Sequence, residues 1–273
     1  MIYHRVGFIG CGNMGGALAS CAAKGIARQG CGTLLLADVD AGKAQALAER
    51  TGGEVVSNGE LAGKCDLIFL AVKPQFLEDA LAGVAPLLLS RTDRFVLVSM
   101  VAGVPMARVR ELAGGAYPII RIMPNTAAFV GAGMIQLCAD GASAEEVAAF
   151  RALMADAGVL DELPERLIDA ASAVSGCGPA YLCLALEGMA DGGVSLGLPR
   201  DKALLYAAQT IAGLGRLAVE TGLHPGVLKD QVTSPGGTTI QGVRALENYS
   251  TRAAFMEAVI AAYEKTVQLK EET

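Results

Sequence analysis

Residues 6–18 read VGFIGCGNMGGAL, and this stretch decides the fold of the N-terminal half of the chain. The apolar run at 5–10 predicts a buried strand, and the Ala-rich residues 13–28 predict a helix directly after it. Between strand and helix lies a G-x-G-x-x-G pattern formed by Gly10, Gly12 and Gly15. Glycines in these places permit a tight turn, the close approach of a pyrophosphate to the backbone, and close packing of the helix. The stretch therefore predicts a dinucleotide-binding loop, with an ordinary tight turn as the alternative.

Strand-like runs alternate with helical stretches over the first 160 residues or so. The expected strands are 5–10, 33–38, 66–72, 94–100, 117–123 and 133–139. The expected helices are 13–28, 41–50, 74–89 and 143–158. This alternation predicts a mainly parallel, doubly wound sheet with helices on both faces.

The pattern changes near Leu163 and Pro164. No strand-like run of Val and Ile follows, and helices are expected over 165–191, 199–221, 237–248 and 250–270. We therefore expect an α/β part joined to an all-α part. Residues 1–163 would form a Rossmann-like domain, and residues 164–273 a helical domain.

Composition narrows the class of protein. The longest uncharged stretches, 122–139 and 170–186, are interrupted by Pro, Gly or Asn, so neither predicts a membrane-spanning helix. The net charge is −6 and no basic stripe is present, which argues against nucleic acid as a partner. The 7 cysteines lack metal-site spacing and suit a reducing compartment, so we expect a cytoplasmic protein without a metal. Neither His4 nor His224 has a carboxylate or nucleophile beside it in sequence.

The second expected strand ends in LADVD (36–40), which places Asp38 where a residue meets the adenosine ribose. A carboxylate there accepts hydrogen bonds from ribose hydroxyls and repels a 2′-phosphate, so taken alone Asp38 favours NAD over NADP. No arginine follows it, and Lys43 is the nearest cation. The alternative is that Asp38 caps the next helix.

Two further loops border the expected ligand crevice, because each follows a strand of the doubly wound sheet. They are LAVKP (70–74) and RIMPNT (121–126). Asn125 in the second loop can hydrogen-bond a nicotinamide or a substrate. The alternative is plain loop structure, since Pro and Asn are common turn residues.

A glycine pair precedes a helix near the C-terminus, in SPGGTT (234–239). Taken alone, it indicates ordinary capping, with Ser234 as the cap and the glycines as a turn.

Five stretches together resemble one family, pyrroline-5-carboxylate reductase, which makes proline. They are GFIGCGNMG, AVKP, RIMPNT, SGCGPAY (175–181) and ETGLHPGVLKDQVTSPGGTT (220–239), in the family's order. The last is the most specific, because it is long and is not shared with general Rossmann dehydrogenases. The resemblance implies hydride transfer from NADPH or NADH to the C=N bond of 1-pyrroline-5-carboxylate. It also implies a helical domain that intertwines two subunits as a homodimer, often assembled further into decamers.

The resemblance assigns site residues by motif. The coenzyme would contact Gly10, Gly12, Asn13, Met14, Gly15, Asn58, Val72, Lys73, Pro74, Met123, Pro124 and Asn125. The substrate loop would comprise Gly236, Gly237, Thr238 and Thr239. Thr239 is the expected hydroxyl near the ring nitrogen, and Glu220 either orients the loop or lies on the exposed side of its helix.

The chemistry that the resemblance implies requires little acid–base machinery, because a protonated cyclic imine already accepts hydride well. The enzyme must instead hold the imine carbon roughly 3–3.5 Å from the nicotinamide. The helix start at SPGGTT offers free N–H groups and a positive dipole end for the substrate carboxylate. Gly236 and Gly237 carry no side chains to block it.

Two positions depart from the family pattern. Cys177 replaces the more usual serine, and the second strand ends without the polar residues or arginine that accept a 2′-phosphate, so either NADP(H) or NAD(H) remains open as the coenzyme. The alternatives are a 6-phosphogluconate or β-hydroxyacid dehydrogenase, another cyclic-imine reductase, and a non-enzymatic nucleotide sensor. The first is disfavoured because no lysine lies between Arg166 and Arg200, and the last because the substrate loop is intact.

Overall fold

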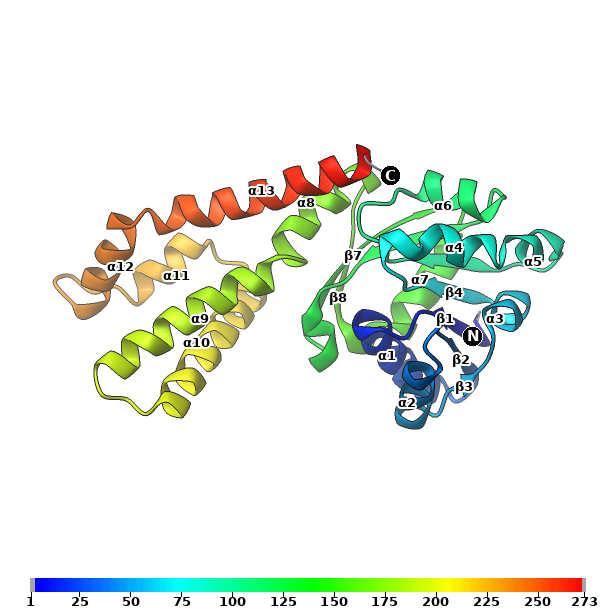
Figure 1. Ribbon diagram of the computed structural model, residues 1–273. Helices are drawn as coiled ribbons and strands as arrows, with labels where there is room; N and C mark the ends of the chain where they lie inside the picture. The colour runs from blue at the N-terminus through cyan, green and yellow to red at the C-terminus, as the bar shows by residue number, and fades with distance from the viewer. Residues whose placement is uncertain (1–2, 272–273) are drawn as a thin grey trace. The chain divides into compact units, whose positions relative to one another are not determined.

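The computed structural model describes residues 3–271 and divides into two compact units (Figure 1). The first unit contains the chain up to Gly176 together with the C-terminal segment from Tyr263. The second unit is Cys177–Ala262. Each unit is described separately below.

The first unit is built on one eight-stranded sheet in the order β3-β2-β1-β4-β5-β6-β7-β8. The strands are β1 Arg5–Ile9, β2 Thr33–Ala37, β3 Glu54–Val55, β4 Leu67–Leu70, β5 Val96–Ser99, β6 Ile119–Met123, β7 Gly133–Asp140 and β8 Gly158–Glu162. All neighbouring pairs are parallel except β6 and β7. The order reverses between β1 and β4, and ligands bind beyond the carboxyl ends of strands at such a switch point.

Helices cover both faces of this sheet. They are α1 Asn13–Gln29, α2 Ala41–Thr51, α3 Asn58–Lys64, α4 Leu77–Ala82, α5 Ala85–Ser90, α6 Met106–Ala113, α7 Ala144–Leu153 and α8 Glu165–Ser175, with 3₁₀ turns at Pro74–Phe76, Thr126–Val130 and Ala155–Ala157. The central strands are buried on both sides, so alternate side chains of β4 enter different cores. Phe69 stacks on Phe8 with ring centroids 4.0 Å apart in one core, and Leu70 lies in the other. The expected doubly wound α/β architecture is confirmed.

Several expected boundaries were wrong. The helix expected over 143–158 ends at Leu153, and β8 follows at the edge of the sheet. The two-residue strand β3 and the helices α3 and α6 were missed. The stretch expected as one helix over 74–89 is a 3₁₀ turn followed by α4 and α5, with Pro86 in the first turn of α5. Proline suits a helix start but interrupts a helix interior.

The second unit is helical throughout its ordered elements. It contains α9 Gly178–Ser195, α10 Arg200–Thr221, α11 Pro225–Gln231, α12 Thr238–Asn248 and the first part of α13 Thr251–Glu271. The helix expected over 165–191 is broken at Gly176 and Cys177, because Pro179 in the first turn of α9 has no N–H to continue the ladder. The helix α11 was also missed.

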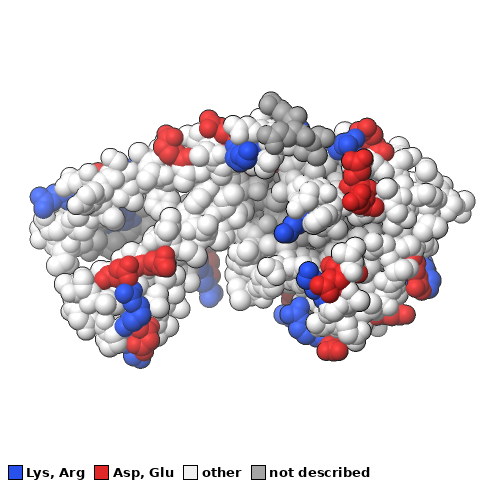
Figure 2. Space-filling model, in the orientation of Figure 1, with Lys and Arg blue, Asp and Glu red and all other residues white. Residues whose placement is uncertain are grey.

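Many large apolar side chains of the second unit are exposed in the single chain. Examples on α9, α10 and α13 are Leu182, Leu184, Met189, Leu205, Leu214, Leu217, Met256 and Ile260. Figure 2 shows uncharged surface over much of these helices, with a group of Lys, Arg, Asp and Glu side chains gathered at the lower left. Exposed apolar surface on this scale marks an interaction site.

One stretch within residues 3–271, Glu165–Ser195, has the length and apolar composition of a membrane-spanning helix, and 17% of its most apolar window is buried. Length and composition alone are weak evidence for a span. The stretch is two helices, α8 and α9, and it carries the buried, ion-paired Asp169 in its first half.

The compact units divide at Gly176, later than the change of sequence pattern at residue 163. The physical reason is that α8, although helical, packs on the sheet: Ile168 lies in the same core as Ile119 of β6 and Cys138 of β7. The C-terminal end of α13 also belongs to the first unit.

Candidate active site

The glycine loop between β1 and α1 has the geometry of a phosphate cradle. Gly10 has φ +105°, and a Cβ there would lie 2.5 Å from the Ala71 carbonyl oxygen. A Cβ on Gly15 would lie 2.2 Å from the Gly10 carbonyl oxygen, whereas a Cβ on Gly12 would meet no atom within 4 Å. Gly12 is the N-cap of α1 and no side chain caps this helix, so its first N–H groups face the opening. Two glycines therefore permit close packing, and the third leaves room for a ligand.

The Asp38 carboxylate is fixed by two backbone donors. Its Oδ2 accepts a hydrogen bond from the Cys11 N–H at 2.6 Å, and its Oδ1 accepts one from the Asp40 N–H at 2.8 Å. The helix after β2 is capped instead by Asp40, whose side chain accepts from Gly42 N–H. The alternative role of Asp38 as that helix's cap is thus wrong, and Asp38 connects the end of β2 to the glycine loop.

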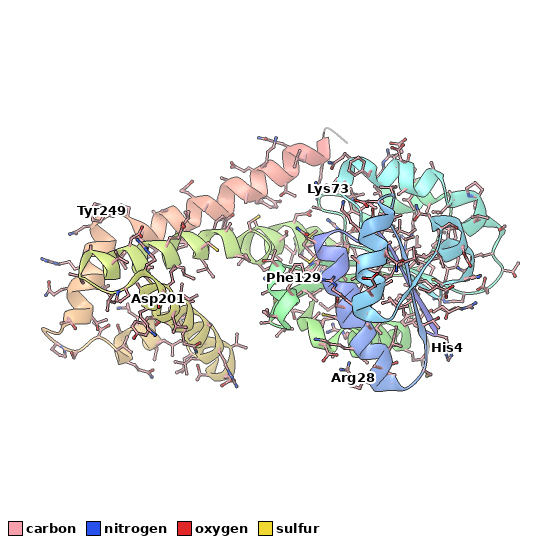
Figure 3. The ribbon with its side chains drawn as sticks, turned by 60° about the horizontal axis from the view of Figure 1, so that its bottom comes forward. His4, Arg28, Lys73, Phe129, Asp201 and Tyr249 are labelled. Atoms are coloured by element: carbon pink, nitrogen blue, oxygen red, sulfur yellow. The ribbon has the colours of Figure 1, made fainter. Side chains whose placement is uncertain are left out.

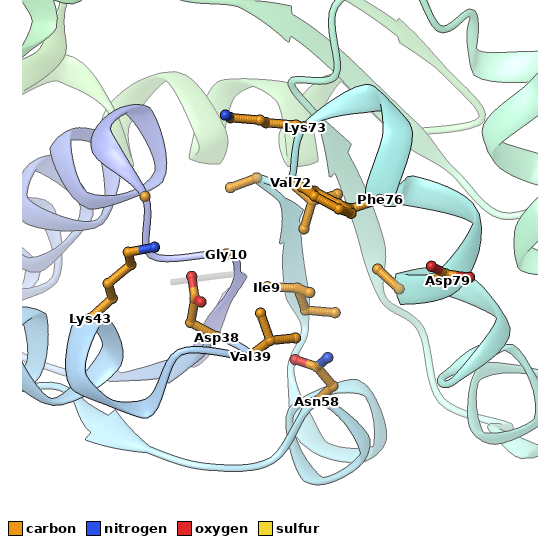
Figure 4. A pocket seen from close by; sticks show the side chains of 13 residues that line it. Ile9, Gly10, Asp38, Val39, Lys43, Asn58, Val72, Lys73, Phe76 and Asp79 are labelled. Carbon is orange, nitrogen blue, oxygen red and sulfur yellow. The ribbon is translucent and has the colours of Figure 1, made fainter.

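A cavity of about 410 Å³ opens at the carboxyl ends of β1 and β4 (Figure 4). It brings together residues that are distant in sequence: Gly10, Gly12, Asp38, Asn58, Val72 and Lys73, all predicted from sequence, together with Ile9, Val39, Lys43, Ala71, Phe76, Asp79 and Ala80. Val39 is 99% exposed and Phe76 is 54% exposed, and both line the cavity. Two exposed apolar side chains at a cavity wall suit the flat face of an adenine. Sequence reasoning missed Phe76, Asp79 and Val39.

A second cavity of about 360 Å³ lies on the other side of the glycine loop. It contains the predicted Asn13, Met14, Gly15, Pro74, Met123 and Pro124 together with Met100 and Ala102, and it shares Gly12, Ala71, Val72 and Lys73 with the first cavity. The two cavities therefore meet at the glycine loop and at Lys73. A dinucleotide with its pyrophosphate on the loop would place one half in each, so the lining fits a nicotinamide coenzyme.

Asn125 lines neither of these cavities, and both the nitrogen and the oxygen of its side-chain amide form hydrogen bonds within the protein. Its Nδ2 donates to the Ser175 carbonyl at 3.0 Å, and its Oδ1 accepts from the Met134 N–H at 3.2 Å. Gln136 Nε2 donates to the Ser175 hydroxyl at 2.7 Å. Asn125 thus joins the loop after β6 to β7 and to the end of α8.

Sequence reasoning missed a buried ionic network between β6 and α8. Arg121 on β6 is 1% exposed, and its Nη2 donates to Asp169 at 2.9 Å while its Nη1 reaches Glu165 at 3.2 Å. Lys270 of α13 pairs with the same Asp169. The available signal was a lone arginine inside the apolar run YPIIRIM, since a buried charge needs a partner.

The cysteine and histidine side chains near the loop and strands are structural. Burial, reinforced by the Asp38 charge, raises the pKa of the Cys11 thiol to about 11. His4 precedes β1 and lies at the opposite end of the sheet from Lys73 (Figure 3). His224 caps α11 by accepting a hydrogen bond from the Gly226 N–H at 3.1 Å. Within residues 3–271, no group of three or more His, Cys, Asp or Glu side chains is placed to hold a metal.

The predicted substrate loop forms the start of α12 in the second unit. Gly236 has φ +72°, a conformation that favours glycine, and Gly237 is the N-cap. No side chain caps the helix, so Ser234 is not its cap; the Ser234 carbonyl instead accepts from the Gly237 N–H at 3.0 Å. Thr238 and Thr239 occupy the exposed first turn. The helix start therefore presents free N–H groups beside two hydroxyls.

Glu220 and Cys177 lie elsewhere in the second unit's sequence. Glu220 is on the exposed side of α10 and accepts a hydrogen bond from Arg216 at 2.7 Å. This pairing agrees with the surface alternative for Glu220. Cys177 is partly buried at the junction before α9.

The switch-point cavities, the glycine cradle and the carboxylate after β2 together define a nicotinamide-dependent oxidoreductase. A family model described as NADP oxidoreductase, coenzyme F420-dependent, matches residues 5–103, and one described as pyrroline-5-carboxylate reductase dimerisation matches residues 165–269.

Relatives in that family match nearly the whole chain. Pyrroline-5-carboxylate reductase of Glycine max is 40% identical over 97% of this chain and 96% of its own length. The Escherichia coli enzyme is 37% identical over 97% and 98%. The crystal structure of Plasmodium falciparum pyrroline carboxylate reductase with NADP bound superposes with a TM-score of 0.85 at 32% identity, covering 99% of both chains. The chain belongs to the pyrroline-5-carboxylate reductase family.

Proposed function

We propose that the sheet unit binds the coenzyme across the two cavities and that the start of α12 anchors the substrate. As a member of its family, the chain reduces the C=N bond of 1-pyrroline-5-carboxylate to give L-proline with NAD(P)H. The coenzyme supplies the hydride. The observation that carries the proposal is the pair of cavities that meet at the glycine loop, where a dinucleotide's pyrophosphate belongs.

Binding of the coenzyme rests on backbone more than on charge. The uncapped N–H groups of α1 hold the pyrophosphate, and Lys73 adds a cation where the two cavities meet. The second cavity is walled by Met100, Met123 and Pro124, which present an apolar surface to the reacting face. Asn125 and the Arg121–Asp169 pair fix the strand end that carries this wall.

Binding of the substrate rests on the uncapped start of α12. The free N–H groups of the first turn and the positive end of the helix dipole suit the substrate's single carboxylate. The Thr239 hydroxyl is then available to hydrogen-bond the ring nitrogen. The Glu220 carboxylate accepts one hydrogen bond from Arg216 and keeps further acceptor sites, so it can orient the substrate loop as well as pair with Arg216 on the helix surface.

The test is an absorbance assay at the reduced-coenzyme band, with pyrroline-5-carboxylate against the six-membered piperideine carboxylate and with both coenzymes. Thr239→Ala should lower kcat by about tenfold or more, the scale of one lost transition-state hydrogen bond. Thr92→Ala, an exposed threonine outside both sites, is the matched control and should leave kcat unchanged. Wild-type kinetics in Thr239→Ala would remove this hydroxyl from the mechanism, and no oxidation with either substrate would overturn the function.

The chain forms an oligomer through its helical part, which the dimerisation model supports. We propose a homodimer as the basic unit, because the exposed apolar side chains of α9, α10 and α13 require cover. A decamer, a cytoplasmic location, and the absence of membrane and nucleic-acid partners are further parts of the proposal. Sedimentation or light scattering of the purified chain measures the number of subunits in the oligomer directly.

A further inference from the structure

We propose that this enzyme selects NADH over NADPH, and that Asp38 is the selecting residue because the glycine loop itself holds its carboxylate in place. The inference rests on the proposed coenzyme site and deepens it. Family membership does not decide the point, since one solved relative has NADP bound.

The first step is the fixed position of the carboxylate. Both oxygens of Asp38 accept backbone hydrogen bonds, from Cys11 at 2.6 Å and from Asp40 at 2.8 Å. An unconstrained aspartate can rotate away to admit a bulky anion, but rotation here would break both bonds. The Cys11 N–H lies between Gly10 and Gly12, so the same movement would disturb the loop that receives the pyrophosphate.

The second step is what remains free on Asp38. Each carboxylate oxygen has two acceptor sites, so one bond to each oxygen leaves acceptor capacity toward the cavity that Asp38 lines. Ribose hydroxyls can donate to these positions. A 2′-phosphate brings about −1.5 to −2 charges and only acceptor oxygens, so it would meet a carboxylate that it can neither bond to nor displace.

The third step is the charge available to offset that repulsion. Among the described residues that line this cavity there is no arginine, and the cations are Lys43 and Lys73. The Lys43 ammonium lies 3.4 Å from the Asp40 carboxylate, so part of its charge is already compensated. Lys73 lies at the junction with the second cavity, toward the pyrophosphate. Asp38 and Lys43 lie on one wall of this cavity (Figure 4). Together with Asp40 they give the ribose end a net negative charge.

The cavity supplies its own control. Asp79 on α4 lines the same cavity from another wall, and no hydrogen bond of the described chain connects it to the glycine loop. Asp79→Asn therefore makes the same change in charge and shape as Asp38→Asn at a different position. If only the net charge of the cavity mattered, the two substitutions would change the ratio of the Kd values for NADPH and NADH alike. Selection at the ribose predicts that only the Asp38 substitutions change this ratio.

The experiment measures equilibrium Kd values for NADH and NADPH by coenzyme fluorescence, which no tryptophan complicates because the chain has none. Wild type should bind NADH at least about tenfold more tightly, the equivalent of 1.4 kcal/mol. Asp38→Ser and Asp38→Asn should reduce the NADPH-to-NADH ratio of Kd values by about tenfold, and Asp79→Asn should keep it within about twofold. The ratio of kcat/KM values should move in the same direction.

A wild-type preference for NADPH, or an unchanged ratio in both Asp38 variants, would overturn the proposal. If the Asp38 variants do not fold, the wild type alone decides: thermal shifts with 5′-AMP against adenosine 2′,5′-diphosphate should favour 5′-AMP, and the reverse order refutes selection. Failure of the proposed function is distinguishable, because it would abolish oxidation of both coenzymes with the imine while leaving these binding ratios intact.

Discussion

The three loop glycines differ in what a methyl group would meet, and this difference predicts opposite outcomes for two substitutions. In Gly15→Ala the new Cβ lies 2.2 Å from the Gly10 carbonyl oxygen and 3.0 Å from the Ala71 Cβ. The first neighbour is backbone, so the loop or α1 must shift. Overpacking costs about 1–3 kcal/mol, and the upper part of that range, about 2–3 kcal/mol, applies to a clash with backbone; the higher helix propensity of alanine offsets about 1 kcal/mol of it. We expect a net loss of about 1–2 kcal/mol in the free energy of unfolding.

In Gly12→Ala the new Cβ meets nothing within 4 Å, and the backbone angles of φ −66° and ψ −172° suit alanine. Alanine lowers the entropy of the unfolded chain, which stabilises the fold, but it is less favourable than glycine at an N-cap. The two effects oppose each other, so the free energy of unfolding should stay within about 0.5 kcal/mol of wild type. In the proposed coenzyme site, the pyrophosphate approaches the backbone at this open space. A methyl group there should raise the Kd for coenzyme by at least about tenfold.

The assays are urea denaturation without coenzyme and fluorescence titration with coenzyme. The expected pattern is crossed: Gly12→Ala keeps stability and loses binding, whereas Gly15→Ala loses stability. Coenzyme affinity at the wild-type level in Gly12→Ala would refute the placement of the pyrophosphate on this loop. Equal destabilisation by the two substitutions would refute the packing argument for Gly15.

Two further predictions concern residues outside the cavities. Glu146→Gln removes a carboxylate that accepts two hydrogen bonds of 2.8 Å from Arg94 and one of 2.7 Å from the Ser143 N–H, and it should cost about 2 kcal/mol at pH 7. Arg94 lowers the pKa of Glu146 in the folded chain, so its contribution is complete above the ordinary value near 4.5 and is lost as the pH falls through the lowered value. Denaturation curves from pH 7 to 3 should therefore converge for the two proteins; a constant gap would contradict the charge-based explanation. Asn125→Asp keeps the acceptor for Met134 but loses the donor to Ser175, so kcat should fall while the Kd for NADH stays within about twofold, and an unchanged kcat would remove Asn125 as a positioning residue.

The sequence was most informative where the physical requirement is local. A strand, three glycines and a helix within 6–18 require one turn geometry, and Gly10 and Gly15 have the contacts expected of them. The start of α7 was likewise predictable, because Ser143 and Glu146 form the capping box within a single turn. Such features depend on residues that are three or four positions apart.

The elements that were missed depend on distant partners. The strand β8 has only Val159 and Leu160 as an apolar signal, and it forms because it can pair with the edge of the sheet at β7. The helix α6 is an exception, because it carried local signals that were overlooked: a proline N-cap, the left-handed Gly114 as C-cap, and buried residues at helical spacing, Met106, Val109 and Ala113. Local pattern decides such short elements poorly, since tertiary pairing supplies most of their stability.

The same distinction applies to the site. Asp38 was predicted from its place at a strand end. Its hydrogen bond with the Cys11 N–H, 27 positions away in sequence, could not be predicted and shows that its carboxylate is held by the glycine loop. Asp38 does not cap the next helix; its hydrogen bond connects the end of β2, the proposed ribose site, to the glycine loop. The pairing of Arg121 with Asp169 spans 48 positions, and no spacing rule could supply the partner.

The lining of the second cavity explains how a site with so few reactive groups can reduce an imine. Of its described lining residues only Lys73 carries a titratable side chain, and the others are glycine, apolar residues and Asn13. Apart from Lys73, such a wall offers no general acid or base, but a protonated imine needs neither and requires only that donor and acceptor carbons be held in line. Rigidity is then the requirement on the protein. Arg121 and Asn125 contribute to it by fixing the end of β6 to α8, through a buried bond to Asp169 and a partly buried bond to Ser175. The charges of this region are used to hold the apolar surface in place, which leaves hydride transfer to depend on position.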